Sequence, residues 1–135
     1  MIVLSNSNAQ TLAPGQSLIF DTVVLHTGCG ECHRPNSGSV GLKGTNGIYD
    51  IYFSGNVSGA AEADVLQLNV MYDMSALPET TMISTATAAN AFQNIGTGTS
   101  VKPCCCSNGL ITIANTGTTT VTIAANPVLK IRRVA

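Results

Sequence analysis

The chain has 135 residues, of which 44% are hydrophobic and only 10% are charged, and its formal net charge is −1. This length predicts a single domain, residues 1–135, with a buried core, and the near-neutral charge excludes the basic surfaces that bind nucleic acid or anionic lipid. No apolar run approaches the roughly 20 residues of a membrane-spanning helix, and the first residues do not have the form of a signal peptide. We therefore expect neither a nucleic-acid nor a membrane partner. A domain so poor in charge favours burial of its surface against other protein chains.

Short apolar runs separated by glycine, threonine, serine and asparagine predict an all-β chain, because no segment keeps a helical period for long. The first extended run is SLIFDTVVL, residues 17–25, and two further strands are expected at residues 47–55 and 64–73. The last two runs alternate between apolar and polar positions. The side chains that share their apolar faces are Tyr49, Ile51, Phe53, Leu66, Leu68, Val70 and Tyr72.

The pattern continues in the last third of the chain. Residues 84–100 contain alanines that would tolerate a short helix, but the flanking threonines and glycines favour an extended, loop-rich crossing. Residues 110–125 are expected to form a β-hairpin around a turn at residues 115–117. The apolar positions that pair across this hairpin are Ile111, Ile113, Val121 and Ile123.

The final strand is expected over VLKIRRVA, residues 128–135, with Leu129 and Ile131 facing the core. The basic side chains of KIRR, residues 130–133, fit best as solubilising charges on an edge strand, and an anion site is the alternative. Together these runs amount to roughly seven or eight short strands with turn signals between them. Such a pattern predicts an antiparallel sandwich or jelly roll.

Four stretches, taken in order, resemble the complement-type and tumour-necrosis-factor-like jelly roll: GIYDIYFSGNVSG, VLQLNVMYD, GLITIANTGTTTVTI and LKIRRVA. The opening SNAQTLAPGQSLIFDTVVLHTG is similar to the first strand of small members encoded by phages and by bacteria such as Firmicutes. The resemblance implies a jelly-roll sandwich that forms a homotrimer and, in tailed phages, serves as a head-fibre, decoration or tail-associated component. The chain departs from larger members because it has no collagenous or coiled-coil segment. Any anchor must then lie within the domain or in a partner.

The strand pattern gives a physical interpretation of the trimer. Tyr52 lies on the face opposite to the apolar face of its strand, and Val65 and Met71 do so in the following strand. Outward apolar side chains of this kind are candidates for a subunit contact around a threefold axis. Scattered apolar residues on a surface also occur without any partner.

The five cysteines form two groups, a C-x₂-C pair at Cys29 and Cys32 and a triplet at Cys104, Cys105 and Cys106. Because extended residues alternate, Cys104 and Cys106 are expected to point one way and Cys105 the other, and adjacent cysteines rarely bond to each other. Two cysteines from each group therefore suit a tetrahedral zinc site. The same four suit two disulfides if the protein meets an oxidising medium.

Zinc is favoured over disulfides because a virion component is assembled in a reducing cytoplasm, where disulfides do not persist. His26, His33 or Cys105 could replace one of the four ligands, and free cysteines in a loop are a further alternative. The letters CGECH also match the attachment pattern of c-type haem, which needs export to an oxidising side. A thioredoxin-like redox pair needs a βαβ setting that the chain does not offer.

No enzymatic activity is expected. The acidic residues are scattered, both histidines lie in the cysteine segment, and neither a nucleophile elbow nor a phosphate-binding loop is present. The preferred function is a structural one: a trimeric capsid-decoration or head-fibre protein, bound to a capsid or fibre protein on the virion surface and assembled in the host cytoplasm. The alternative is a recognition module that binds a host glycan or protein at a fibre tip or bacterial surface. The absence of tryptophan and the location of all tyrosines on strands favour the structural role.

Overall fold

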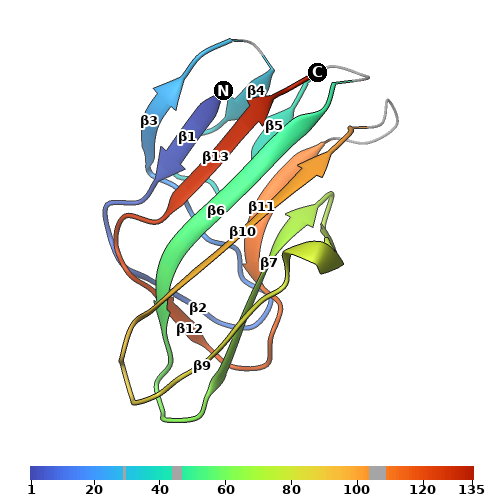
Figure 1. The fold of residues 1–135 in the computed structure, drawn as a ribbon. Coiled ribbons are helices and arrows are strands. Elements are labelled where there is room, and N and C mark those ends of the chain that lie inside the picture. The colour runs from blue at the N-terminus through green and yellow to red at the C-terminus, as the bar shows by residue number, and fades with distance from the viewer. Residues whose placement is uncertain (29, 44–46, 104–108) are drawn as a thin grey trace.

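The computed structural model describes residues 1–28, 30–43, 47–103 and 109–135. These residues form thirteen strands and one short 3-10 turn, arranged as two antiparallel sheets that pack face to face (Figure 1). The elements are β1 (Ile2–Ser5), β2 (Gln10–Leu12), β3 (Thr22–His26), β4 (Glu31–His33), β5 (Val40–Leu42), β6 (Tyr49–Ser58), β7 (Val65–Tyr72), β8 (Ser75–Ala76), η1 (Pro78–Thr80), β9 (Met82–Thr85), β10 (Gln93–Val101), β11 (Leu110–Asn115), β12 (Val121–Ile123) and β13 (Val128–Arg133). The described residues contain no helix long and apolar enough to cross a membrane.

The first sheet has seven strands and is organised around β6, the longest strand. Its order is β2-β12-β6-β13-β1-β3, and β10 pairs with the other edge of β6. The strand β13 therefore lies between β6 and β1, with Arg132 in register with Asp50. The prediction that residues 130–133 form an edge strand is wrong. A central strand with one solvated face carries charges at alternate positions just as an edge strand does, so the sequence does not distinguish the two.

The second sheet has six strands in the order β4-β5-β11-β7-β8, with β9 paired to β7. The predicted apolar face of β7 is confirmed, because Leu66, Leu68 and Val70 are buried. Tyr72, at the end of this row, is only half-buried. On the opposite face Asn69 is also buried, and its side-chain amide donates to the carbonyl oxygen of Leu77 at 3.1 Å.

A single apolar core fills the space between the two sheets. The inward positions of β6 and β13 are confirmed, since Ile51, Leu129 and Ile131 are each fully buried. Burial of aliphatic side chains on this scale is the main source of stability in a domain of this size. The core residues are Ile2, Leu4, Leu12, Leu18, Phe20, Val40, Leu42, Tyr49, Ile51, Phe53, Val57, Leu66, Leu68, Val70, Met82, Ile111, Ile113, Val121, Ile123, Leu129 and Ile131.

The predicted hairpin over residues 110–125 is wrong. The strand β11 pairs with β5 and β7 in the second sheet, whereas β12 pairs with β2 and β6 in the first. Asn115 supports the chain between them, because its side-chain amide donates to the carbonyl oxygens of Leu12 at 3.0 Å and Thr119 at 2.8 Å. Two strands that face each other across a core carry the same apolar alternation as two paired strands, so the sequence pattern fits both arrangements.

The extended conformation expected for residues 84–100 is confirmed, because β9 and β10 occupy most of that range. Residues 17–25 are less regular than expected. Ser17 and Phe20 make isolated bridges, and the regular strand β3 begins only at Thr22. All five side chains of β3 are exposed, and the strand ends the order of its sheet.

Candidate functional site

The strands β4 and β5 lie at the end of the sandwich where both chain termini also lie (Figure 1). The backbone N–H of Leu42 donates to the carbonyl oxygen of Gly109 at 2.9 Å, and that of Lys43 donates to Gly30 at 2.7 Å. Gly30 follows the first cysteine, and Gly109 follows the triplet segment. Leu42, the last residue of β5, and Lys43, which follows it, therefore bind the glycines that border the two cysteine segments.

Only one of the predicted zinc ligands falls within the described residues. Cys32 is exposed on β4, where it pairs in register with Gly41, and Gly41 pairs on its other side with Leu110. Cys29 and residues 104–106 lie outside the described residues, so the proposed set of Cys29, Cys32, Cys104 and Cys106, with Cys105 as alternative, stays a prediction. Within the described ranges, no three His, Cys, Asp or Glu side chains gather as a metal site would require.

Both histidines named as alternative ligands contact backbone carbonyl oxygens. His26 Nε2 lies 3.0 Å from the oxygen of Glu31. His33 Nδ1 lies 2.9 Å from the oxygen of Ser39, and its Nε2 lies 3.2 Å from that of Phe20. A metal at either nitrogen of His33 would displace one of these contacts, since a ligating nitrogen presents its lone pair to the metal.

Tyr49 is a core residue whose hydroxyl binds the backbone at this end of the molecule. Its hydroxyl donates to the carbonyl oxygen of Gly30 at 3.2 Å and closely approaches that of Lys43. A methyl group at Gly30 would lie only 2.8 Å from this hydroxyl, so a side chain there would force Tyr49 to move. Burial raises the pKa of Tyr49, and among its charged neighbours Arg133 opposes and Glu31 reinforces that shift.

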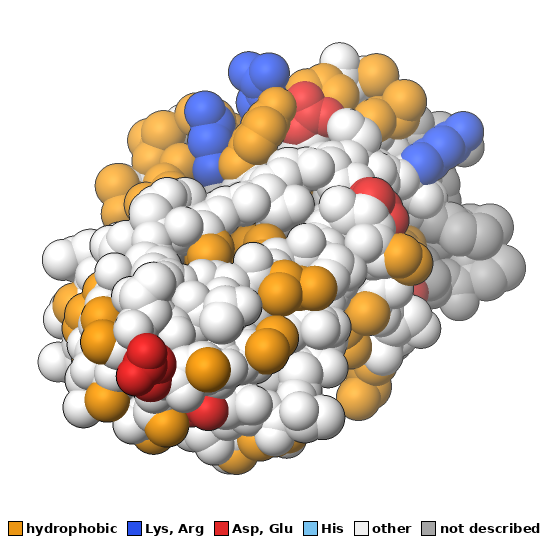
Figure 2. Space-filling model, turned by 60° about the horizontal axis from the view of Figure 1, so that its bottom comes forward, with side chains coloured by type: hydrophobic (Ala, Val, Ile, Leu, Met, Phe, Trp, Pro, Cys, Tyr) orange, Lys and Arg blue, Asp and Glu red, His pale blue; other side chains and the backbone are white. Residues whose placement is uncertain are grey.

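A second feature of the chain is a flat region of uncharged side chains on the outer face of the first sheet, which we call the glycine-lined face. It is made by outward residues of β6, β10 and β13, namely Tyr52, Ser54, Asn56, Asn94, Gly96, Gly98 and Val128. Lys130 and the Arg132–Asp50 salt bridge lie beside it on the same face. Figure 2, which looks more toward the lower end of the molecule, shows a surface on which charged groups are few.

The glycines make this face flat. Gly98 pairs with Tyr52 and Gly96 pairs with Ser54. A methyl group at Gly98 would lie 3.0 Å from Cδ1 of Tyr52, which places the edge of the ring over the glycine. Glycine weakens a strand interior and often marks a site where another chain approaches closely. On the other side of Tyr52 lies Lys130, the cation nearest to it in register.

The predicted outward residues divide between the two sheets. Tyr52 is 46% exposed on the glycine-lined face. Val65 is exposed and Met71 is half-buried, but both belong to β7 in the second sheet. One flat contact surface therefore cannot contain all three residues.

The chain matches no protein-family model and no curated protein. Among solved structures, the globular domain of the zebrafish complement 1qA protein superposes with a TM-score of 0.71 at 10% identity, over 99% of this chain and 96% of that chain. The chain has the tumour-necrosis-factor-like jelly-roll fold. Eiger TNF from S. frugiperda gives a TM-score of 0.68 at 8% identity, over 99% and 91% of the two chains.

A viral protein also shares this jelly roll. The PRD1 vertex protein P5 superposes with a TM-score of 0.51 at 15% identity, over 99% of this chain and 94% of that chain. The resemblance inferred from the sequence stretches is thus confirmed for the jelly-roll fold. At these identities the likeness concerns the fold alone, and function has to be argued from the surface of this chain.

We expect the change Tyr49→Phe to lower the free energy of unfolding by about 1 kcal/mol at neutral pH, because two carbonyl oxygens lose their donor. The raised pKa means that the folded state holds the phenol proton more tightly than the unfolded state, whose value is near 10.0. Stability from this source is complete below that pH and is lost as the pH rises through the folded-state pKa. Urea unfolding at neutral and alkaline pH should show that the free energy of unfolding falls less with rising pH in Tyr49→Phe than in the control Tyr52→Phe. An equal loss in both variants would contradict this role.

Proposed function

We propose that this chain is a non-enzymatic structural component of a virion, a trimeric decoration or head-fibre protein that covers or stabilises a tailed-phage particle. The observation that carries the proposal is the glycine-lined face. It offers exposed apolar groups, Tyr52 at 46% and Val128 at 43%, on a flat surface that Lys130 and the Arg132–Asp50 salt bridge border at one end. Such a surface suits burial against another protein better than it suits contact with water.

The occupant we propose for this face is a second copy of the chain. The same sheet ends in β3, whose exposed Val23, Val24 and Leu25 add an apolar edge to the same molecule. An edge on one copy that meets a flat face on the next forms a heterologous contact, and three such contacts close into a ring. The homotrimer implied by the sequence resemblance has this form.

The virion role is supported by the fold shared with the PRD1 vertex protein P5. A fold supports many functions, so the argument also needs the surface. Here the surface favours packing. Within the described residues, the two salt bridges are those of the Met1 amino group with Glu31 and of Arg132 with Asp50. The docking partner we propose is a capsid or fibre protein.

We further propose that the cysteine segments hold one zinc ion through Cys29, Cys32, Cys104 and Cys106. The support from the structure is that Gly30 and Gly109, at the borders of the two segments, bind neighbouring residues of β5. Zinc bound by thiolates from both segments would join β4 to the start of β11 and stabilise this end of the domain.

The trimer predicts that Ser54→Arg abolishes self-association, because it places a long charged side chain between Gly96 and Val128. Light scattering and sedimentation should find the native chain as a trimer at micromolar concentration and the variant as a folded monomer. Thr85→Arg is the matched control, since Thr85 is exposed on β9 in the opposite sheet. A monomeric native chain, or a trimeric Ser54→Arg variant, would refute the proposed contact.

The zinc site predicts about one metal ion per chain in elemental analysis of protein purified under reducing conditions. Cys32→Ser should lose the metal and melt at a lower temperature, whereas Cys105→Ser should keep both the metal and the melting temperature. Metal-free protein that melts at the temperature of the untreated protein would exclude a structural zinc. Thiol counting on unreduced particles would then separate disulfides from free cysteines.

The virion role predicts many copies of the chain on the capsid of purified particles from the virus that encodes it. Quantitative mass spectrometry and cryo-electron microscopy of those particles would give the copy number and the location. A few copies at a tail tip, together with glycan-array binding by the trimer, would favour the recognition module instead. Absence of the chain from all virion-sized particles would contradict the structural role.

A further inference from the structure

Glu31, the first residue of β4, carries a buried carboxylate that the fold does not fully satisfy. Its side chain is only 1% exposed. One oxygen, Oε2, lies 3.3 Å from the amino nitrogen of Met1, but the other, Oε1, is buried and has no hydrogen-bond partner among the described residues. A buried carboxylate oxygen without a donor is unfavourable, so Oε1 calls for a donor that the described residues do not supply.

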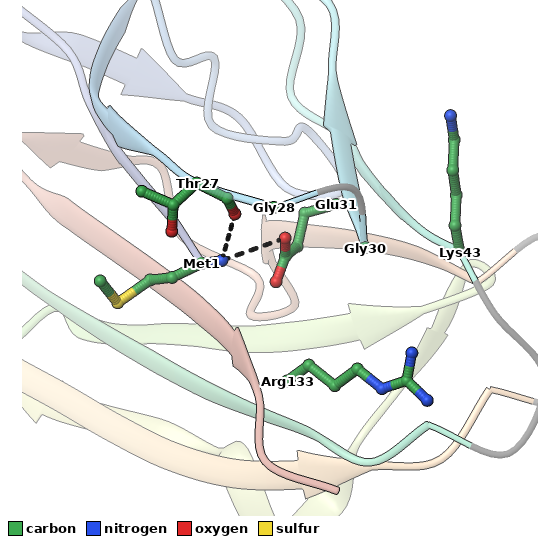
Figure 3. Close-up of a pocket in the computed structure, with 7 residues that line it drawn as sticks. All are labelled: Met1, Thr27, Gly28, Gly30, Glu31, Lys43 and Arg133. Atoms are coloured by element: carbon green, nitrogen blue, oxygen red, sulfur yellow. Dashed lines mark hydrogen bonds and ion pairs between the residues drawn. The ribbon is translucent and has the colours of Figure 1, made fainter.

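This carboxylate lines a pocket of about 340 Å³ at the end of the sandwich. The described lining residues are Met1, Thr27, Gly28, Gly30, Glu31, Lys43 and Arg133. Figure 3 shows the carboxylate of Glu31 near the middle of this group, with Met1 on one side and with Lys43 and Arg133 on the other. The volume is at the lower end of the range for small-molecule sites.

The two side-chain cations of the pocket, Lys43 and Arg133, have no carboxylate partner within the described part of the chain, whereas the amino group of Met1 pairs with Glu31. Neither Lys43 nor Arg133 takes part in a salt bridge there. Arg133 uses its Nε to donate to the carbonyl oxygen of Ala135 at 2.9 Å, and its terminal nitrogens make no hydrogen bond with the described residues. The pocket thus combines two cations that suit an anion with one buried acceptor that needs a donor.

These features restrict the chemistry of a ligand. A simple cation would satisfy Glu31 but would meet the charges of Lys43 and Arg133. A simple anion would satisfy those two side chains but would leave Oε1 without a donor. A carboxylate that also carries hydroxyl groups satisfies all three residues, because guanidinium groups bind carboxylates in bidentate geometry and a hydroxyl donates to Oε1.

We propose that this pocket binds a small hydroxylated carboxylate, the chemistry of an acidic sugar. Arg133 holds the carboxylate of the ligand, Lys43 adds positive charge at the rim of the pocket, and Glu31 Oε1 accepts a hydrogen bond from one of the ligand's hydroxyl groups.

The test is isothermal titration calorimetry with chain that carries no tag at either end, because Met1 lines the pocket and Ala135 contacts Arg133. Glucuronate should bind at millimolar concentration or below, and glucose, its neutral counterpart, at least about tenfold more weakly, a difference of ~1.4 kcal/mol. Lactate distinguishes two classes of ligand, sugar acids and small hydroxy acids. If lactate binds more weakly than glucuronate, the site is one for sugar acids; if the two bind equally, it is one for small hydroxy acids. No heat with either acid, or equal affinity for glucuronate and glucose, would overturn the proposal.

Variants locate the binding. Arg133→Gln should weaken glucuronate binding at least about tenfold, whereas Lys130→Gln, which removes the same charge from the same strand, should leave it unchanged. Glu31→Gln tests the hydroxyl contact and should reduce the preference for glucuronate over propionate, which has no hydroxyl group. Equal affinities in Arg133→Gln and Lys130→Gln would place any bound acid elsewhere and refute the site.

Discussion

The packing of two antiparallel sheets around one shared apolar core is the constraint on which the rest of this molecule depends. Each strand that contributes to the core buries alternate side chains, as Ile51 of β6 and Ile113 of β11 do from opposite sheets. The intervening positions are then obliged to face outward, whatever their chemistry. The glycine-lined face exists because β10 places Gly96 and Gly98 at outward positions, opposite Ser54 and Tyr52 of β6. The surface that we assign to assembly is therefore the direct complement of the core.

Much of this architecture could be predicted from the sequence, because alternation is a strong signal in long strands. Residues 47–55 and 64–73 each carry three or more alternating apolar positions, and residues 128–135 carry two, Leu129 and Ile131. All three ranges contain strands with the expected inward faces. The position of a strand within its sheet was not predictable in the same way. The error over residues 110–125 arose because alternation reports burial on a common core and not pairing, and strands of three residues, such as β2, are too short to show any period.

The candidate sites were less accessible to prediction. A single glutamate in a cysteine-rich segment gives no signal of burial. The burial of Glu31 depends on the fold, which places its carboxylate beside the amino group of Met1 in the same pocket. The role of Tyr49 was likewise not predictable. An aromatic residue in an alternating strand is predicted to be buried in the core whether or not its hydroxyl binds a loop. The cysteines show the opposite case, a conspicuous pattern whose chemistry depends on side chains outside the described residues. Solved structures with only 8 to 15% sequence identity share this fold, so the jelly roll itself requires few particular residues.

The exposed strand β3 has a consequence for the life of the protein before assembly. A strand at the end of a sheet presents unpaired backbone groups, and here Val23, Val24 and Leu25 give it neither a charge nor a proline to discourage a new partner. A newly made chain is thus vulnerable to open-ended strand addition, which leads to fibres. Rapid capture of this edge during synthesis would then matter as much for the yield of the protein as the stability of its finished fold.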